Sequence, residues 1–266
     1  MRRDITLGQY FPGDSVIHRL DPRTKILMVV VYLVALFTAN HMVSITLVVI
    51  FLGLTIALSE VKLRLLLRGL RPLIIILALT GSLNLFLTPG EPIFSVWIIQ
   101  ITAEGVYRSL TLVLRIVMMV IGTFILTYTT PPMMLTDGME SLMGPLKRIR
   151  VPVHELTLIM SMALRFIPNL IEETDRIMRA QKARGADFET GNIFKRAKAL
   201  IPLLIPLFMS AFRRADELAI AMESRCYHGG EGRTRMRQLK FERRDILAGL
   251  TGIGLLAVVI GLAVMG

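Results

Sequence analysis

The sequence predicts an all-α integral membrane protein with about five transmembrane helices and a cytoplasmic block of long amphipathic helices. Hydrophobic residues make up 53% of the 266 residues, and the mean hydropathy is +0.61. Several stretches long enough to enter a bilayer are almost free of charge, and lysine and arginine gather in alternate connecting segments. Soluble domains carry fewer apolar residues and no such runs, so these observations favour a membrane protein.

The spans follow from the charge-free runs. Residues 26–58 contain no charged side chain unless His41 is protonated. One helix of that length would measure about 50 Å, whereas a hydrocarbon core is about 30 Å thick. The polar pair Asn40-His41 therefore divides the run into two short spans. We expect the spans at 25–38, 42–58, 72–87, 106–130 (ended by Pro131 and Pro132) and 246–266.

The basic residues predict the orientation. The formal net charge is +11, and twenty of the 31 Lys and Arg residues lie in 131–245. Most of the others lie in 1–25 and 59–71, and none lies in 39–42 or 88–107. By the positive-inside rule the N-terminus, 59–71 and 131–245 are cytoplasmic. This orientation bias explains the basic excess better than a dedicated patch for an anionic partner does.

These assignments divide the chain into three parts. An N-terminal transmembrane domain covers 1–130, a cytoplasmic coupling domain covers 131–245, and a C-terminal transmembrane helix covers 246–266. The connection at 88–107 has turn residues and a short apolar stretch, so we expect it to be irregular or briefly β.

One charge lies inside a predicted span. Arg115 falls within 106–130, where a charged side chain is costly and normally faces a partner group or water. We expect Arg115 to serve a structural or subunit contact and not to face lipid.

The cytoplasmic segment is too long for a simple loop and must have structure of its own. Apolar residues at helical spacing predict a helix over 155–184, kinked at Pro168 and capped by Gly185. A second helix is predicted over about 203–225, beginning after Pro202. The apolar run 199–212 is too short to span, and it either lies on the inner leaflet or dips into it.

The ends of the two helices are alike. Ala183-Arg184-Gly185 closes the first helix, and Ser224-Arg225-Cys226 closes the second. An arginine at a helix C-terminus complements the helix dipole and offers five fixed donors to a carboxylate on a partner. Ala211, Ala215 and Ala219 form a ridge of small residues that lets another helix approach closely. Together these features indicate a docking device for another protein.

Catalytic and nucleotide-binding motifs are missing from the sequence. It has no phosphate-binding loop of the G-x-x-x-x-G-K-[ST] type, no H-E-x-x-H and no G-x-S-x-G, and its four histidines are not spaced as ligands or bases. The single cysteine, Cys226, excludes an intrachain disulfide. We therefore expect a chain that is not an enzyme and binds neither a cofactor nor a metal.

Several short sequence segments resemble those of a known family. Each match is weak alone, but their order and spacing together are specific. The chain resembles the transmembrane T component of energy-coupling factor transporters, the EcfT and CbiQ-like family of cobalt and vitamin importers. The segments are residues 18–25, 101–105, 129–132, 164–168 and 179–185, together with Arg115.

The resemblance implies a function, a location and partners. In this family the subunit lies in the prokaryotic cell membrane and joins two cytoplasmic ATP-binding cassette ATPases to a small membrane-embedded S component that selects the substrate. ATP is bound by the ATPases, and the arginines of two Ala-Arg-Gly-type motifs insert into grooves on them. Arg184 matches the first motif fully, and Arg225 matches the second at its centre. Because Cys226 takes a left-handed cap less cheaply than glycine, we expect the second helix to continue toward Gly229-Gly230.

Two other functional hypotheses remain. A pathway-forming permease of a conventional ABC transporter would need a polar pore and typically has one coupling motif per subunit. A membrane enzyme acting on lipid-linked substrates would need convergent carboxylates or histidines near one membrane face. Neither pattern is found in the sequence, and the permease is the runner-up.

Overall fold

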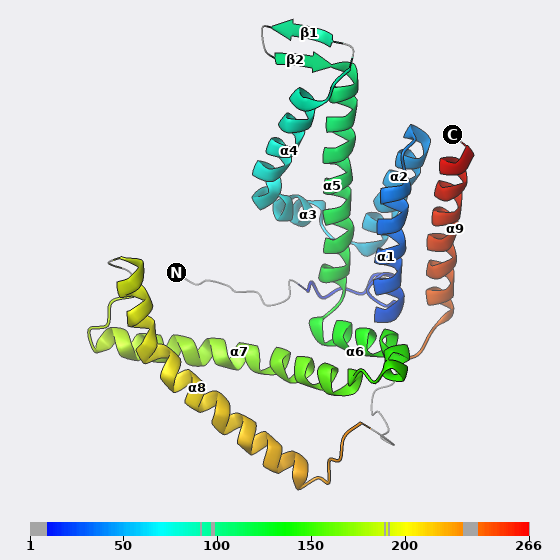
Figure 1. Ribbon diagram of the computed structural model, residues 1–266. Coiled ribbons are helices and arrows are strands. Elements are labelled where there is room, and N and C mark those ends of the chain that lie inside the picture. The colour runs from blue at the N-terminus through cyan, green and yellow to red at the C-terminus, as the bar shows by residue number, and fades with distance from the viewer. Residues whose placement is uncertain are drawn as a thin grey trace. The chain divides into compact units, whose positions relative to one another are not determined.

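The structure, a computed structural model, describes residues 10–90, 92–96, 99–188, 190, 192–230 and 239–265. Nine α-helices lie in this described part of the chain (Figure 1). The chain divides into two compact units. One unit joins the residues before Met143 to those from Leu239 onward, and the other is Met143–Gln238.

The first unit is helical, as predicted, and carries one short hairpin. Its strands pair antiparallel, with Ser95 opposite Gln100 and Val96 opposite Ile99, which confirms that the connection at 88–107 is briefly β. The elements are α1 (Pro22–Thr38), α2 (Met42–Ser59), α3 (Leu63–Leu70), a 3-10 turn (Arg71–Leu73), α4 (Ile74–Leu87), β1 (Pro92–Val96), β2 (Ile99–Thr102), α5 (Ala103–Thr129), α6 (Pro132–Leu142) and α9 (Arg243–Met265).

Side-chain caps explain why two helices begin earlier than expected. The Asp21 carboxylate accepts a hydrogen bond from the Arg23 amide at 2.9 Å, and Pro22 occupies the first turn of α1. The Thr102 hydroxyl accepts one from the Gly105 amide at 3.0 Å and begins α5. Each cap satisfies an amide that has no partner within its helix. Both helices therefore start three residues before the predicted spans.

The segment 59–71, expected as a loop, contains the helix α3. Leu66 and Leu70 are 0% and 8% exposed, so α3 is packed into the unit by its apolar face. Its two arginines, with Lys62 before it and Arg71 after it, gave the segment the composition of a polar connection. Burial of two leucines one turn apart stabilises the helix.

Four stretches of the described chain are long and apolar enough to cross a membrane. They are Met42–Ser59, Leu63–Leu87, Ala103–Thr129 and Arg243–Met265. Helix α1 has 17 residues and would measure about 26 Å, less than the hydrocarbon core of about 30 Å. A crossing by α1 thus stays a prediction.

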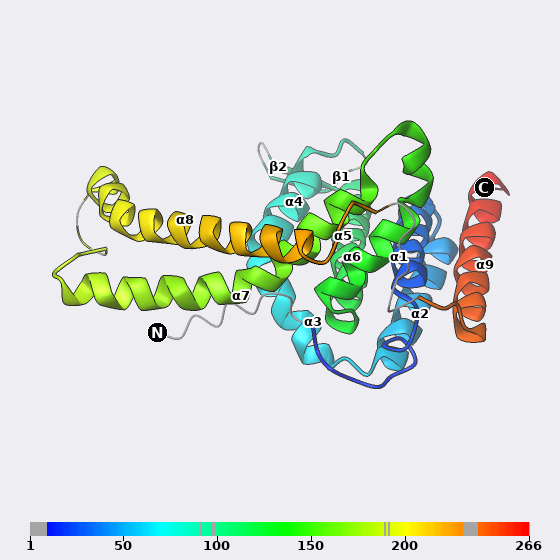
Figure 2. The ribbon, with the colours of Figure 1, turned by 90° about the horizontal axis from the view of Figure 1, so that it is seen from below.

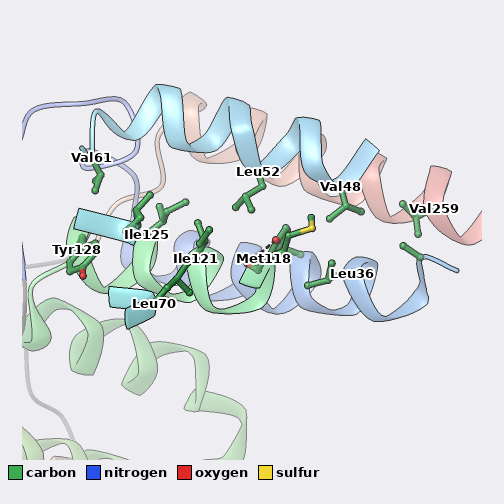
Figure 3. Close-up of a cluster of buried hydrophobic side chains, with 13 residues drawn as sticks. Leu36, Val48, Leu52, Val61, Leu70, Met118, Ile121, Ile125, Tyr128 and Val259 are labelled. Carbon is green, nitrogen blue, oxygen red and sulfur yellow. Dashed lines mark hydrogen bonds between the residues drawn. The ribbon is translucent and has the colours of Figure 1, made fainter. Parts of the chain in front are cut away.

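The core of the first unit lies where α1, α2, α5 and α9 meet (Figure 3). Leu36, Val48 and Val259 are 2%, 0% and 0% exposed. The Tyr32 hydroxyl donates to the Met118 carbonyl at 3.1 Å, so the tyrosine fastens α1 to α5 inside this apolar environment.

Gly122 of α5 is needed for this contact. A Cβ atom at position 122 would lie 2.5 Å from the Tyr32 ring. We expect Gly122→Ala to destabilise the protein by about 1–3 kcal/mol through overpacking, which lowers its melting temperature by several degrees. Thermal unfolding of the purified chain in detergent measures this change.

Gly53→Ala is the matched control, because a Cβ atom there would meet nothing within 4 Å. If both alanine variants melt at the same temperature, the close contact of Gly122 with Tyr32 does not constrain the fold.

The second unit holds a 3-10 turn (Gly144–Ile149), α7 (Val153–Ala183) and α8 (Ile193–Glu223). The predicted start of the second helix near 203 is wrong, because α8 begins ten residues earlier. Pro202 and Pro206 lie inside it on its exposed side. A proline removes one backbone hydrogen bond but allows the helix to continue when its surroundings hold the neighbouring turns. The run 199–212 is part of this helix.

Candidate functional site: two capped helix ends

The predicted arginine motif at the end of α7 forms a complete helix cap. Gly185 has φ +86°, in the left-handed region. The Gly185 amide donates to the Lys182 carbonyl and the Ala186 amide donates to the Gln181 carbonyl, both at 3.0 Å. These two bonds define a Schellman motif, so the prediction that Gly185 caps this helix is confirmed.

The second motif has the same geometry. Cys226 has φ +55°, its amide donates to the Glu223 carbonyl at 2.9 Å, and the Tyr227 amide donates to the Met222 carbonyl at 3.0 Å. The expectation that the helix continues toward Gly229-Gly230 is wrong. The two cap bonds stabilise the left-handed residue, although a side chain there costs about 1–2 kcal/mol relative to glycine.

The two caps give their arginines equivalent positions. Arg184 and Arg225 each directly precede the left-handed residue, and both are exposed. Neither guanidinium has a hydrogen bond or ion pair in the described part of the chain. Ala183 and Ser224, the small residues before them, are also exposed. Each helix end therefore presents an unpaired cation beside a small residue and a sharp turn.

The equivalence of the caps predicts opposite effects for two substitutions. Cys226→Gly relieves the left-handed strain and should stabilise the last turn of α8 by about 0.5–1 kcal/mol. Gly185→Ala introduces the same strain and should weaken the last turn of α7 by about 1 kcal/mol. Hydrogen exchange of the Tyr227 and Ala186 amides reports the two caps separately. Slower exchange at both sites, or faster exchange at both, would contradict the equivalence.

The two ends lie at opposite ends of the helix pair. Helices α7 and α8 contact each other and run in opposite directions, so the end of α7 and the end of α8 point apart (Figures 1 and 2). Arg214 of α8 donates to Glu173 of α7 at 2.7 Å, and both side chains are partly buried. This ion pair joins the helices at their contact.

Helix α8 has two apolar faces. Leu203 is 5% exposed, and the half-buried residues that share its face at helical spacing include Leu207 and Leu218. The predicted small ridge, Ala211, Ala215 and Ala219, is exposed and continues the i, i+4 row of Leu203 and Leu207. It continues a stripe of large exposed side chains: Ile201, Leu204, Ile205, Phe208 and Phe212. On α7, Pro168 is also exposed.

Arg115 has a partner that the sequence does not reveal. Its Nη2 atom donates to the carbonyl oxygen of Ala39 at 2.7 Å, and Ala39 is the residue that ends α1. A cation at a helix C-terminus complements the dipole, so Arg115 makes a structural contact within the chain; a contact with another subunit stays a prediction.

A buried polar network in the first unit brings together two of the segments that carry the family resemblance. The Lys25 ammonium donates to the carbonyls of His18 and Thr129 at 3.1 and 3.0 Å, and to the Thr130 hydroxyl at 3.2 Å. Lys25 is 6% exposed. Residues 18–25 and 129–132 therefore meet as a structural joint between the start of α1 and the end of α5.

Asp245 completes this network and was missed in the sequence. Its Oδ1 atom accepts a hydrogen bond from the Asp21 amide, and its Oδ2 atom accepts one from the Glu242 amide, both at 2.8 Å. Asp245 is 4% exposed. The available signal was a lone acid in the first turn of a long apolar helix, which is typical of an N-terminal cap.

The comparisons with known proteins cover nearly the whole chain. The CbiQ family, described as cobalt transport protein, matches residues 13–236. An "Energy-coupling factor transporter transmembrane protein EcfT" of Thermosediminibacter oceani is 54% identical over 256 residues, which cover 96% of each chain. The proteins of the same name from Acidaminococcus fermentans and Lactococcus lactis are 53% and 48% identical over 255 and 246 residues. These cover 96% and 92% of this chain, and 95% and 92% of the relatives.

Proposed function

The chain belongs to the CbiQ family, and we propose that it couples two cytoplasmic ATPases to a membrane-embedded S component through Arg184 and Arg225. It is a non-catalytic, multi-pass transmembrane subunit of an energy-coupling factor transporter. The residues that carry the coupling are the two capped helix ends, 183–185 and 224–226.

The observation that carries this proposal is the duplication of one geometry. Two helices of 31 residues end in the same cap, and each cap holds an unpaired exposed arginine within the described chain. Two equivalent helix ends that point apart suit two partners of the same kind, and a pair of ATPases is such a set of partners. A guanidinium offers the fixed donors that a carboxylate in a groove on an ATPase would accept.

The exposed stripe of α8 suits the second partner. The stripe comprises Ile201, Leu204, Ile205, Phe208 and Phe212, with Ala211, Ala215 and Ala219 continuing it. Large apolar side chains exposed in a row mark a contact surface, and small residues at i, i+4 spacing allow a helix to pack closely. We assign this stripe to the S component, with Pro168 a further contact on α7.

The mechanism uses the contact between the two coupling helices. ATP bound by the partner ATPases draws them together, and each ATPase carries one arginine-anchored helix end. Because α7 and α8 are joined at Glu173–Arg214, moving their ends changes the angle at which they cross. The stripe on α8 then presses on the S component and reorients it to accept or release a vitamin or a metal ion.

The orientation in the membrane follows the distribution of basic residues. The N-terminus, the segment 59–71 and the coupling helices lie on the cytoplasmic side of the bacterial cell membrane. This side is the one on which ATP is available to the partner ATPases.

Purification of the tagged chain from native membranes in mild detergent, followed by mass spectrometry, tests the assembly. The proposal expects two ATP-binding cassette ATPases and at least one small membrane protein of the S type. A complex of the chain with itself, one kind of ATPase and an extracellular binding protein would favour the conventional permease.

A further inference from the structure

We propose that the arginine row of α3, defined as Arg64, Arg68 and Arg71, binds the phosphate groups of an anionic phospholipid at the membrane surface. This inference concerns the first unit alone, and it holds whether or not the coupling proposal is correct.

The row is an unpaired cationic surface. Its members are spaced at i, i+4 and i+7, which places them along one side of α3 and the 3-10 turn that follows. All three are exposed, and none has a hydrogen bond or ion pair in the described part of the chain. Together with Leu63 and Leu67 they line a hollow of about 350 Å³.

The opposite face of α3 is fixed to the unit. Leu66 and Leu70 are 0% and 8% exposed. A Cβ atom at Gly69 would lie 2.4 Å from the Phe124 ring of α5, so the two helices touch closely. The arginines are therefore presented by a rigid element and not by a loop.

The position of α3 along the membrane is that of lipid headgroups. It follows the candidate span Met42–Ser59 and forms the first two turns of the candidate span Leu63–Leu87, whose charge-free part begins only after Arg71. Its contact Phe124 lies five residues before the end of α5 at Thr129, which is about 8 Å along the helix axis. A short amphipathic helix at this depth lies in the interface, where phosphates are concentrated.

The side chains match both parts of a phospholipid. Guanidinium groups bind phosphate oxygens in a bidentate manner, and three in a row suit a diester that a single ammonium would hold less well. Leu63 and Leu67, 55% and 53% exposed, lie beside the row and can contact acyl chains. A soluble acidic partner would explain the arginines but not these exposed leucines at the membrane surface.

The test uses the full chain, delipidated in detergent and titrated with phosphatidylglycerol or phosphatidylcholine under native mass spectrometry. We expect preferential binding of phosphatidylglycerol. The variant Arg64→Gln/Arg68→Gln/Arg71→Gln should lose affinity for it by about fivefold per arginine, roughly a hundredfold in total. The triple lysine variant keeps the charge and should retain an intermediate affinity, which separates loss of the site from misfolding.

The matched control is Arg19→Gln/Arg243→Gln/Arg244→Gln. It removes the same charge from exposed positions of the same unit and should leave the preference for phosphatidylglycerol intact. Equal loss in the control, or none in the α3 variant, would overturn the proposal. Displacement of the lipid by inorganic phosphate at millimolar concentration would also overturn it, because the row would then be a site for free phosphate.

Discussion

Glutamate at position 184 or 225 is expected to detach the membrane subunit from its ATPases. Each guanidinium is exposed and unpaired in the described chain, so its charge is available to a carboxylate on a partner. Removing one member of a desolvated, hydrogen-bonded charge pair costs about 2–5 kcal/mol, and reversing the sign adds repulsion. Either single variant should therefore lower the recovery of ATPase by more than tenfold, and the double variant should abolish ATP-dependent uptake.

The measurement is copurification of the ATPases with tagged variants, followed by substrate uptake in the same cells. Arg179→Glu on α7 and Arg213→Glu on α8 are the controls, since both residues are exposed on the same helices but lie before the caps. Full ATPase recovery and normal uptake with Arg184→Glu/Arg225→Glu would show that these ends do not carry the coupling. A loss equal to that in the control variants would point to general electrostatic attraction.

Alanine at position 245 is expected to prevent stable folding of the membrane unit. The Asp245 carboxylate is 4% exposed and accepts hydrogen bonds from two backbone amides, of Asp21 and Glu242. Its loss leaves the buried Asp21 amide and the partly buried Glu242 amide without their acceptor. It also removes one of the two carboxylates whose charge acts on buried Lys25. We expect a destabilisation of about 3–5 kcal/mol, a large share of a typical stability of about 5–15 kcal/mol.

The amount of protein in membranes and its melting temperature in detergent report this loss. Asp14→Ala removes an exposed carboxylate from the same unit and should change neither quantity. Asp245→Asn retains one good acceptor and should fall between the wild type and Asp245→Ala. Normal expression and melting of Asp245→Ala would mean that these two hydrogen bonds contribute nothing measurable.

Features with local signals could be predicted from the sequence. The ends of α1, α2 and α4 agree with charge-free runs and turn residues, and the cap at Gly185 follows from a glycine after an amphipathic run. The helix α3 and the early start of α8 differ from the prediction because their local sequences are typical of other structures. Basic residues are typical of a loop at α3, and Pro202 is typical of a helix start, although α8 continues through it.

Contacts between distant backbone groups could not be predicted. The partner of Arg115 is the carbonyl oxygen of Ala39, and every residue type has such an oxygen, so no side-chain pattern marks it. Asp245 likewise binds the amide of Asp21 across 224 residues. The cap at Cys226 differs from the prediction because two backbone hydrogen bonds stabilise a left-handed conformation that a cysteine side chain alone disfavours.

The bond between Asp21 and Asp245 sets an order for biosynthesis. Helix α1 is made first, yet α9, which packs beside it and supplies Asp245, is made last. At about 5–20 residues per second, the ribosome needs roughly 10–45 seconds to cover the 224 residues between them. Throughout that interval the Asp21 amide lacks its final acceptor, so the membrane unit closes only after the whole coupling segment has been translated. A chain that stops before α9 therefore lacks the hydrogen bond between the Asp21 amide and the Asp245 carboxylate.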